Sequence, residues 1–192
     1  MTFYFTYTPT INVALDLIKK KKNLDFTIRE ISNVLNVSHT SLYRHFPSKL
    51  GIILEIGTIG FLKLNTEFEE IISINPASNM LYKICECYIK FSYKNANYYR
   101  VMFSQELRCG EEHPESFTKV ADKGYDYIEN ALSVTEPRKF RKFNYNVGAR
   151  SIWASLHGFS QLLIDGNFYD LKSEEDIIEA IQSHLALLSI KN

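Results

Sequence analysis

Apolar residues recur three and four positions apart along nearly the whole chain, which is the spacing of one face of an α-helix. Gly and Pro, which interrupt helices, cluster between these segments. No segment shows a convincing strand pattern. The chain has 192 residues, of which 45% are hydrophobic, so it is large enough to bury a core. The sequence therefore predicts a folded, all-helical protein.

The predicted helices begin with a segment at about 10–22 that would turn one apolar face inward, namely Ile11, Ala14, Leu15 and Ile18. Two short helices follow at about 27–35 and 38–46. A long helix starts after Pro47 with Ser48 as its cap, and it would bury Leu50, Ile53, Leu54, Phe61, Leu64 and Phe68. Further helices are expected near 78–95, 97–107, 114–134, 139–166 and 173–190. Residues 1–9 could form a loose arm or pack on the rest of the protein, and the sequence leaves both possibilities open.

The formal net charge is zero, but the charges are unevenly distributed. Residues 1–50 hold seven Lys or Arg against three Asp or Glu, and residues 51–192 hold 15 against 19. A basic head on an acidic body would direct phosphate binding to the head, although so small an asymmetry also arises by chance. Three cysteines without a leader-like segment favour a reducing cytoplasm over secretion, and no apolar run is long enough to cross a bilayer. We therefore expect a soluble cytoplasmic protein.

The segment from Thr27 to Lys49, TIREISNVLNVSHTSLYRHFPSK, carries the most informative pattern. Thr27 and Glu30 have the spacing of a capping box. Asn36 suits a tight turn because Asn tolerates the left-handed backbone conformation, and Ser38 would cap the next helix. The first helix would bury Ile28, Ile31, Val34 and Leu35, with Val37 in the corner. These features predict a helix-turn-helix.

The second helix of this motif, Ser38 to Phe46, would bury Leu42 and Phe46. The residues left outside are His39, Thr40, Ser41, Tyr43, Arg44 and His45. Short polar side chains at the N-terminal end of such a helix can reach base edges in the major groove, whereas Tyr, His and Arg at its far end suit phosphates. Lys49 adds a positive charge at the start of the following helix, where backbone N–H groups favour an anion.

At these residues the chain resembles the TetR family of bacterial transcription regulators, most specifically at Leu42-Tyr43, His45-Phe46 and Ser48-Lys49. The resemblance covers about residues 10–58. Trp153, His157 and Gly158 also look like the Trp-His-Gly signature of one class of TetR-family C-terminal domains. Two features depart from the pattern: Lys22-Asn23-Leu24-Asp25 lacks a glycine between the first two helices, and the usual basic residues before the first helix are missing.

The resemblance implies a DNA-binding domain at 1–50 and a ligand-sensing and dimerisation domain at 51–192. It implies that the DNA-facing residues are Arg29, His39, Thr40, Ser41, Tyr43, Arg44, His45 and Lys49. Tyr43, His45 and Lys49 are the expected phosphate contacts, His39, Thr40 and Ser41 are the candidates for base edges, and Arg44 could serve either role. The alternative is that Tyr43 and His45 simply cover the core.

The body would supply a dimer interface and a ligand pocket. TetR-like proteins dimerise through their last helices, and the corresponding apolar stripes here contain Ile152, Leu156, Phe159, Leu163, Ile177, Ile181, Leu185 and Leu188. Part of both stripes must also serve the core of a single chain. Aromatic residues of the central helices would suit an apolar or aromatic ligand, and our candidates are Tyr88, Phe91, Tyr99, Phe103, Tyr125, Trp153 and His157. Plain core packing is the alternative.

Other functional classes are weaker. The chain has no G-x-S-x-G, no phosphate-binding glycine loop and no H-E-x-x-H. We therefore expect a protein that is not an enzyme and that binds neither a cofactor nor a metal. Cys85 and Cys87 would point to different faces of one helix as buried thiols, and Glu111-Glu112-His113 reads as an exposed loop that could bind a metal only weakly. We predict a transcriptional regulator, most simply a repressor, that binds a palindromic operator as a homodimer and is released by a small molecule. A ligand-independent, architectural DNA-binding protein is the alternative.

Overall fold

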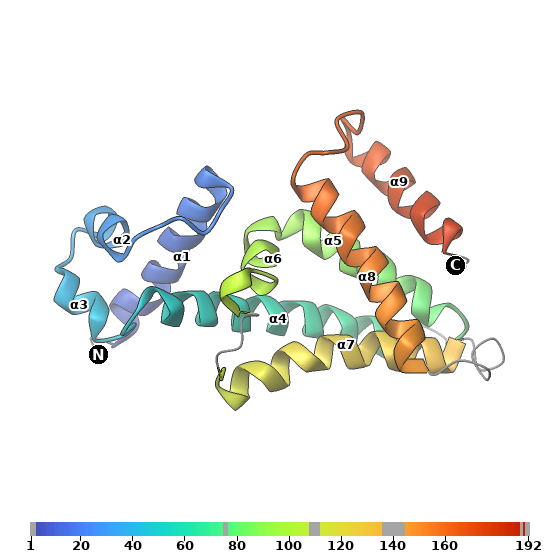
Figure 1. The fold of residues 1–192 in the computed structure, drawn as a ribbon, viewed down its shortest axis with the longest axis horizontal. Helices are drawn as coiled ribbons and strands as arrows, with labels where there is room; N and C mark the ends of the chain where they lie inside the picture. The colour runs from blue at the N-terminus through green and yellow to red at the C-terminus, as the bar shows by residue number, and fades with distance from the viewer. Residues whose placement is uncertain (1–2, 75–76, 108–111, 136–144, 189, 191–192) are drawn as a thin grey trace. The chain divides into compact units, whose positions relative to one another are not determined.

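The computed structural model describes residues 3–74, 77–107, 112–135, 145–188 and 190, and every regular element in them is helical (Figure 1). The elements in chain order are α1 (Phe3–Lys21), α2 (Ile28–Leu35), α3 (His39–Tyr43), α4 (Lys49–Ile74), η1 (Ala77–Asn79), α5 (Met80–Lys94), α6 (Ala96–Met102), η2 (Gln105–Leu107), α7 (Glu115–Thr135), α8 (Tyr145–Ile164) and α9 (Glu174–Leu187), where η marks a 3-10 turn. The all-helical prediction is confirmed. None of the helices in these ranges is both long and apolar enough to span a membrane.

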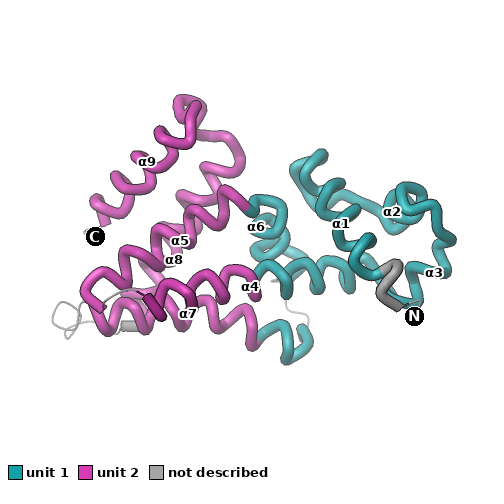
Figure 2. Tube along the Cα trace, turned by 180° about the vertical axis from the view of Figure 1, so that it is seen from behind, with its two compact units in different colours: residues 1–61, 95–118 teal, residues 62–94, 119–192 magenta. Residues whose placement is uncertain are grey.

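Contacts divide the chain into two compact units (Figure 2). Unit 1 comprises Met1–Phe61 and Asn95–Thr118, and unit 2 comprises Leu62–Lys94 and Lys119–Asn192. The chain passes between the units at three points. Two of these points fall inside α4 and α7, which each supply residues to both units, and the third lies between α5 and α6. Each unit has a buried core of its own.

In unit 1, α1 packs against α2, α3 and α6. The inward face predicted for α1 is confirmed, because Ile11, Ala14, Leu15 and Ile18 are all buried. The other elements of the unit add buried apolar residues to the same core, among them Phe26, Ile31, Leu42, Phe46, Ile52, Ile53 and Ile56. These residues hold the helix-turn-helix segment to the start of α4.

The predicted start of α1 at residue 10 is wrong, because the helix begins at Phe3 and contains Pro9. Proline in a helix removes one backbone hydrogen bond, so other contacts of this segment must offset the lost free energy. The ring of Tyr7 stacks on that of Phe46, with centroids 5.1 Å apart, and its hydroxyl donates to the Glu55 carboxylate. The open question about residues 1–9 is thus answered for residues 3–9, which extend α1, and Tyr7 packs on unit 1.

The predicted extent of the second short helix is also wrong, since α3 ends at Tyr43 rather than Phe46. The N–H of His45 donates to the carbonyl of Leu42 at 2.9 Å, three residues back, so the chain tightens into a turn at Arg44 and His45. The turn still leaves Leu42 and Phe46 buried, as predicted.

Two further expectations need correction. Val34 is 63% exposed, because the buried stripe of α2 runs through Ile31 and Ser32 and Val34 lies off it by about a third of a turn. The helix expected at 97–107 stops at Met102 and is followed by η2, so that Phe103 can set its ring edge against Phe61, with centroids 5.6 Å apart. The helix expected at 139–166 corresponds to α8, which begins at Tyr145. Residues 139–144 lie outside the described part of the chain.

In unit 2, α5 is the most deeply buried helix and packs against α8 and α9. Both Cys85 and Cys87 are buried, which confirms the prediction of buried thiols. Burial raises the pKa of both thiols well above its usual range, so they stay protonated and are poor nucleophiles. Asn65 of α4 donates its amide to the carbonyl of Val120, which ties α4 to α7 within the unit.

Candidate nucleic-acid interface

The N-terminal end of α2 is fixed by a complete capping box, as the sequence predicted. Thr27 Oγ1 accepts a hydrogen bond from the backbone N–H of Glu30 at 3.1 Å, and Glu30 Oε2 accepts one from the N–H of Thr27 at 2.8 Å. Lys21 at the end of α1 forms an ion pair with the same carboxylate at 2.7 Å. Lys21 and the capping bonds hold the pKa of Glu30 below its usual range. The first two helices are therefore joined by charge as well as by packing.

The turn between α2 and α3 has the geometry that its sequence predicted. Asn36 adopts the left-handed conformation, with φ 52° and ψ 44°, and its N–H donates to the carbonyls of Ser32 and Asn33. Ser38 has extended backbone angles and its hydroxyl accepts from the N–H of Ser41 at 3.2 Å. Both caps restrict where α3 can start, so the direction of this short helix is set by the turn.

α3 presents one buried face and one open face. Leu42 is completely buried on the inner side, whereas His39, Thr40 and Arg44 are exposed and Ser41 and His45 are half-buried. Half of the Tyr43 surface is exposed, so this side chain is not confined to covering the core. Arg29, the predicted contact on α2, is exposed as well. The residues that the helix-turn-helix exposes at these positions are polar, as expected of a segment that enters a DNA groove.

Lys49 is positioned by the side chain beneath it. Ser48 caps α4 by accepting from the N–H of Gly51 at 3.2 Å, as predicted, and Lys49 is the first residue of the helix. Its ammonium lies 4.9 Å from the centre of the buried Phe26 ring. This cation–π contact holds a positive charge at a helix N-terminus, where it can meet a phosphate.

Sequence reasoning missed two residues that shape this region. Lys22 directly follows α1 with φ 56°, so it takes the left-handed role that the family pattern would give to a glycine. Tyr7 supports Phe46 and contacts Glu55. Burial, together with the hydrogen bond to Glu55 and the charge of that carboxylate, raises the pKa of the Tyr7 hydroxyl well above the usual value. For Lys22, the missing glycine between the first two helices was a signal in the sequence. For Tyr7, the only signal was the run of aromatic residues at the N-terminus.

The candidate ligand residues do not form one cluster. Within unit 2, the Trp153 indole donates to the Tyr88 hydroxyl at 3.1 Å, and Tyr125 and His157 lie with ring centroids 6.1 and 6.2 Å from that of Trp153. Tyr99 and Phe103 belong to unit 1, where their ring centroids are 4.8 Å apart. Phe91 is buried and lines a separate pocket in unit 2, described below.

The residues predicted for the dimer interface lie mostly inside the single chain. Leu156, Leu163, Ile177, Ile181 and Leu185 are buried there, and Ile152, Phe159 and Leu188 are half-buried. A different set of α8 residues is exposed at spacings of three and four: Val147, Ser151, Ala154, Gly158 and Leu162. We refer to these five residues as the outer stripe of α8. On α9, Ser183, Ala186 and Leu187 are exposed, Leu187 by 85%.

The described residues supply no set of ligands for the weak metal site considered at Glu111-Glu112-His113. Glu111 lies outside them, Glu112 is exposed, and the His113 ring contacts Phe117 while its Nε2 lies 2.6 Å from the carbonyl oxygen of Leu107. Among the described residues no three His, Cys, Asp or Glu side chains gather as metal ligands would.

Comparisons with known families agree with this geometry. The model described as "Tetracyclin repressor-like, C-terminal domain" matches residues 81–188, more than half of the chain, and the model "Bacterial regulatory proteins, tetR family" matches residues 11–56. The chain belongs to the TetR family. The second match contains the complete helix-turn-helix of this TetR-family protein. No curated protein matches it by sequence.

Several solved structures share the TetR-family fold. PfmR, a TetR family transcriptional regulator from Thermus thermophilus, is 19% identical with a TM-score of 0.71, over 95% of this chain and 99% of that one. FadR from Bacillus subtilis, solved with stearoyl-CoA, is 15% identical with a TM-score of 0.73, over 97% and 100%. A tetR-family regulatory protein from Rhodococcus RHA1 is 18% identical with a TM-score of 0.73, over 97% and 96%. At these identities the similarity shows the fold.

Proposed function

We propose that this TetR-family chain is a transcriptional repressor that binds a palindromic operator as a homodimer. The observation that carries the proposal is the open face of α3, where exposed polar side chains stand on a helix that is anchored by Leu42 and capped at its N-terminal end by Ser38. His39, Thr40 and Ser41 read base edges at the N-terminal end of α3. Tyr43, His45 and Lys49 contact phosphates, Arg44 contacts either a phosphate or a base edge, and Arg29 approaches the DNA from α2.

The charge distribution supports the same surface. Residues 1–50 hold seven Lys or Arg against three Asp or Glu. Of these, Lys21 and Glu30 already neutralise each other in an ion pair within the unit. The exposed Lys19, Lys20 and Lys22 at the end of α1 remain available to attract DNA. We therefore keep residues 1–50 as the DNA-binding domain and residues 51–192 as the domain for dimerisation and ligand response.

Dimerisation follows from the operator geometry, because two half-sites about one helical turn apart need two copies of α3. We propose that the partner packs on the outer stripe of α8 and on Ser183, Ala186 and Leu187 of α9. Small side chains at Ser151, Ala154 and Gly158 would let two helices approach closely. The half-buried Ile152, Phe159 and Leu188 would lie at the edge of this interface.

A small molecule would release the operator by favouring an arrangement of residues 51–192 that bound DNA does not favour. The coupling is reciprocal, so the operator should weaken ligand binding by the same factor. Binding of stearoyl-CoA by the similar FadR structure supports a ligand response of this kind. The cluster of Trp153, His157, Tyr88 and Tyr125 is one candidate region, and we propose that it corresponds to the Trp-His-Gly type of C-terminal domain.

The test is a gel shift with DNA from the region upstream of the gene for this chain. A repressor forms a discrete complex that depends on a palindrome, whereas an architectural protein coats DNA in proportion to its length. Lys49→Ala should weaken binding to every sequence and lower the slope of affinity against salt by about one. Lys172→Ala, at an exposed site in unit 2, is the matched control and should change neither. An unchanged slope for Lys49→Ala would remove the phosphate role of this residue.

A further inference from the structure

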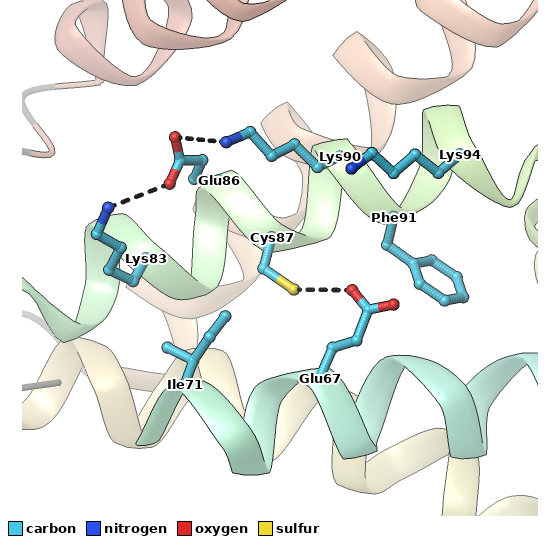
Figure 3. A pocket seen from close by; sticks show the side chains of 8 residues that line it. All are labelled: Glu67, Ile71, Lys83, Glu86, Cys87, Lys90, Phe91 and Lys94. Atoms are coloured by element: carbon cyan, nitrogen blue, oxygen red, sulfur yellow. Dashed lines mark hydrogen bonds and ion pairs between the residues drawn. The ribbon is translucent and has the colours of Figure 1, made fainter. Parts of the chain in front are cut away.

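Unit 2 contains a half-open pocket of about 250 Å³ between the C-terminal half of α4 and α5 (Figure 3). Its lining combines two apolar side chains, Ile71 and Phe91, with three lysines, two glutamates and a thiol: Lys83, Lys90, Lys94, Glu67, Glu86 and Cys87. The volume lies just under the range of about 300–1,000 Å³ typical of pockets for drug-sized ligands, so a smaller molecule fits. None of the aromatic cluster around Trp153 lines this pocket.

The lysines of the pocket outnumber the carboxylates that could neutralise them. Glu86 accepts from both Lys83, at 3.4 Å, and Lys90, at 3.0 Å, so one carboxylate serves two ammonium groups (Figure 3). Within the described residues Lys94 makes no ion pair or hydrogen bond. The row of charges along α5 therefore keeps an excess of positive charge, and two of its members, Lys90 and Lys94, follow each other by one helical turn.

The inner wall is different in character. Cys87 donates its thiol hydrogen to Glu67 Oε2 at 3.4 Å, with Ile71 on one side of this pair and Phe91 on the other (Figure 3). Burial, reinforced by the Glu67 carboxylate, raises the pKa of Cys87, so this thiol stays a neutral donor. A ligand in the pocket would meet apolar surface and one carboxylate on this side, and positive charge at the outer rim.

We propose that this pocket binds a small organic carboxylate. Its acid group lies at the outer rim on Lys90 and Lys94, and its apolar body lies against Phe91 (Figure 3). Charge-assisted hydrogen bonds from lysine to carboxylate supply the specificity for an anion. Glu67 opposes the anion from the inner wall, which gives the site a distinctive signature: removing that charge strengthens binding.

The experiment measures binding of benzoate and hexanoate to the purified full-length chain by calorimetry, without DNA. At least one of them should bind. The neutral analogues benzyl alcohol and hexanol should bind about tenfold more weakly, since they lack the charge that the lysines recognise. Inorganic phosphate should compete poorly because it has no apolar body. Failure of both carboxylates to bind, equal binding of the alcohols, or equal competition by phosphate would each overturn the inference.

Three variants tie the binding to this pocket. Lys94→Met should lower the affinity about fivefold at low salt, and Glu67→Gln, whose amide oxygen can still accept from Cys87, should raise it about threefold. Lys172→Met leaves the pocket intact and should have no effect. Lys94 has no partner to lose among the described residues, so its variant should melt at the wild-type temperature. An unchanged affinity in the Lys94 variant would place the carboxylate elsewhere and refute the site.

An effect of the carboxylate on operator binding rests on the proposed function. α4 supplies Glu67 and Ile71 to the pocket and Lys49 to the candidate DNA interface. Benzoate or hexanoate should therefore reduce the gel-shifted complex of the wild type and spare that of the Lys94→Met variant. The two ideas fail separately: loss of calorimetric binding removes the pocket, whereas binding without an effect on DNA leaves the pocket and removes its role in release.

Discussion

Lys22 and Asn36 both hold the left-handed backbone conformation, with φ 56° and 52°. They directly follow α1 and α2, where a residue in this conformation closes the last turn of the helix and changes the direction of the chain. Asn tolerates it because its short polar side chain can bond locally, whereas for lysine it costs about 1–2 kcal/mol. The sequence predicted Asn36 from this chemistry. At Lys22 the same requirement is met by an unfavourable residue.

We therefore expect Lys22→Gly to stabilise the protein. Relief of the left-handed strain outweighs the greater chain entropy of glycine in the unfolded state, for a net gain of about 0.5–1 kcal/mol in the free energy of unfolding. Urea unfolding measures the difference. Lys20→Gly, two residues earlier in the helical conformation, should instead lose about 1 kcal/mol. Destabilisation by both changes would mean that Lys22 makes contacts worth more than its strain.

Thr40 is the α3 residue at which we expect a base pair to be read. The side chain is exposed on the first turn of α3. Thr40→Ala should cost about 1–3 kcal/mol on operators that carry the preferred base pair and little on those that do not. Binding to a set of operators with single substitutions measures this. A uniform loss on every operator would show that Thr40 contacts the backbone or only supports α3.

Among the elements, α4 depends on close approach by its neighbours in unit 1. A Cβ added at Gly57 would lie 2.7 Å from Leu107 Cδ1 and 3.2 Å from Phe117 Cε2, whereas one at Gly51 would have only Pro47 nearby, at 3.8 Å. Gly57→Val should therefore lower the free energy of unfolding by about 1–3 kcal/mol through overpacking. Gly51→Val on the same helix should change it little. Equal effects at both sites would mean that the packing around Gly57 can yield.

The contact between α8 and α9 should make stability depend on pH. His184 Nε2 lies 3.3 Å from Ser155 Oγ, and its ring stacks on Phe159 with centroids 4.4 Å apart. Burial lowers the pKa of His184 below its usual 6.5, so the unfolded chain binds the proton more readily than the folded chain. The stabilisation by neutral His184 is complete above about pH 6.5 and is lost as the pH falls through the lowered folded pKa.

The free energy of unfolding should accordingly fall between pH 7 and pH 5. His184→Gln should flatten this slope, and His39→Gln, the same change at an exposed site on α3, should retain it. Glu30 and Glu69 also have lowered pKa values, but from ordinary values of 4.5, so their contributions are lost at lower pH. A slope that persists in the His184 variant would assign the effect to another group.

Sequence patterns predict those features of the helices that depend on neighbouring residues. Regular spacing predicted the buried face of α1, and side-chain chemistry predicted the caps at Thr27, Ser38 and Ser48. Such features depend on residues within one or two turns. The start of α1 was missed because it depends on Tyr7 meeting Phe46, far along the chain. For the same reason the stripes of α8 and α9 could not reveal which apolar residues pack inside one chain.

At the scale of the whole molecule, the proposed function requires two copies of the chain. One α3 reads a half-site, and a palindrome presents that half-site twice. The single chain buries five of the eight residues first expected at the interface, namely Leu156, Leu163, Ile177, Ile181 and Leu185. What it leaves open is the outer stripe of α8, with small side chains at its centre and apolar ones at its ends. Dimerisation should therefore depend on the centre of this stripe.

Ala154→Arg places a long charged side chain at that centre. If two copies of α8 cross there, each would bury an unpaired guanidinium, and the cost would dissociate the dimer. Sedimentation velocity should show a monomer, and operator binding should weaken because a single head makes half of the contacts. Asn130→Arg, at an exposed site on α7, adds the same side chain away from the stripe and should remain dimeric. A dimer that survives Ala154→Arg would move the interface to another surface and leave the DNA-binding face of α3 untouched.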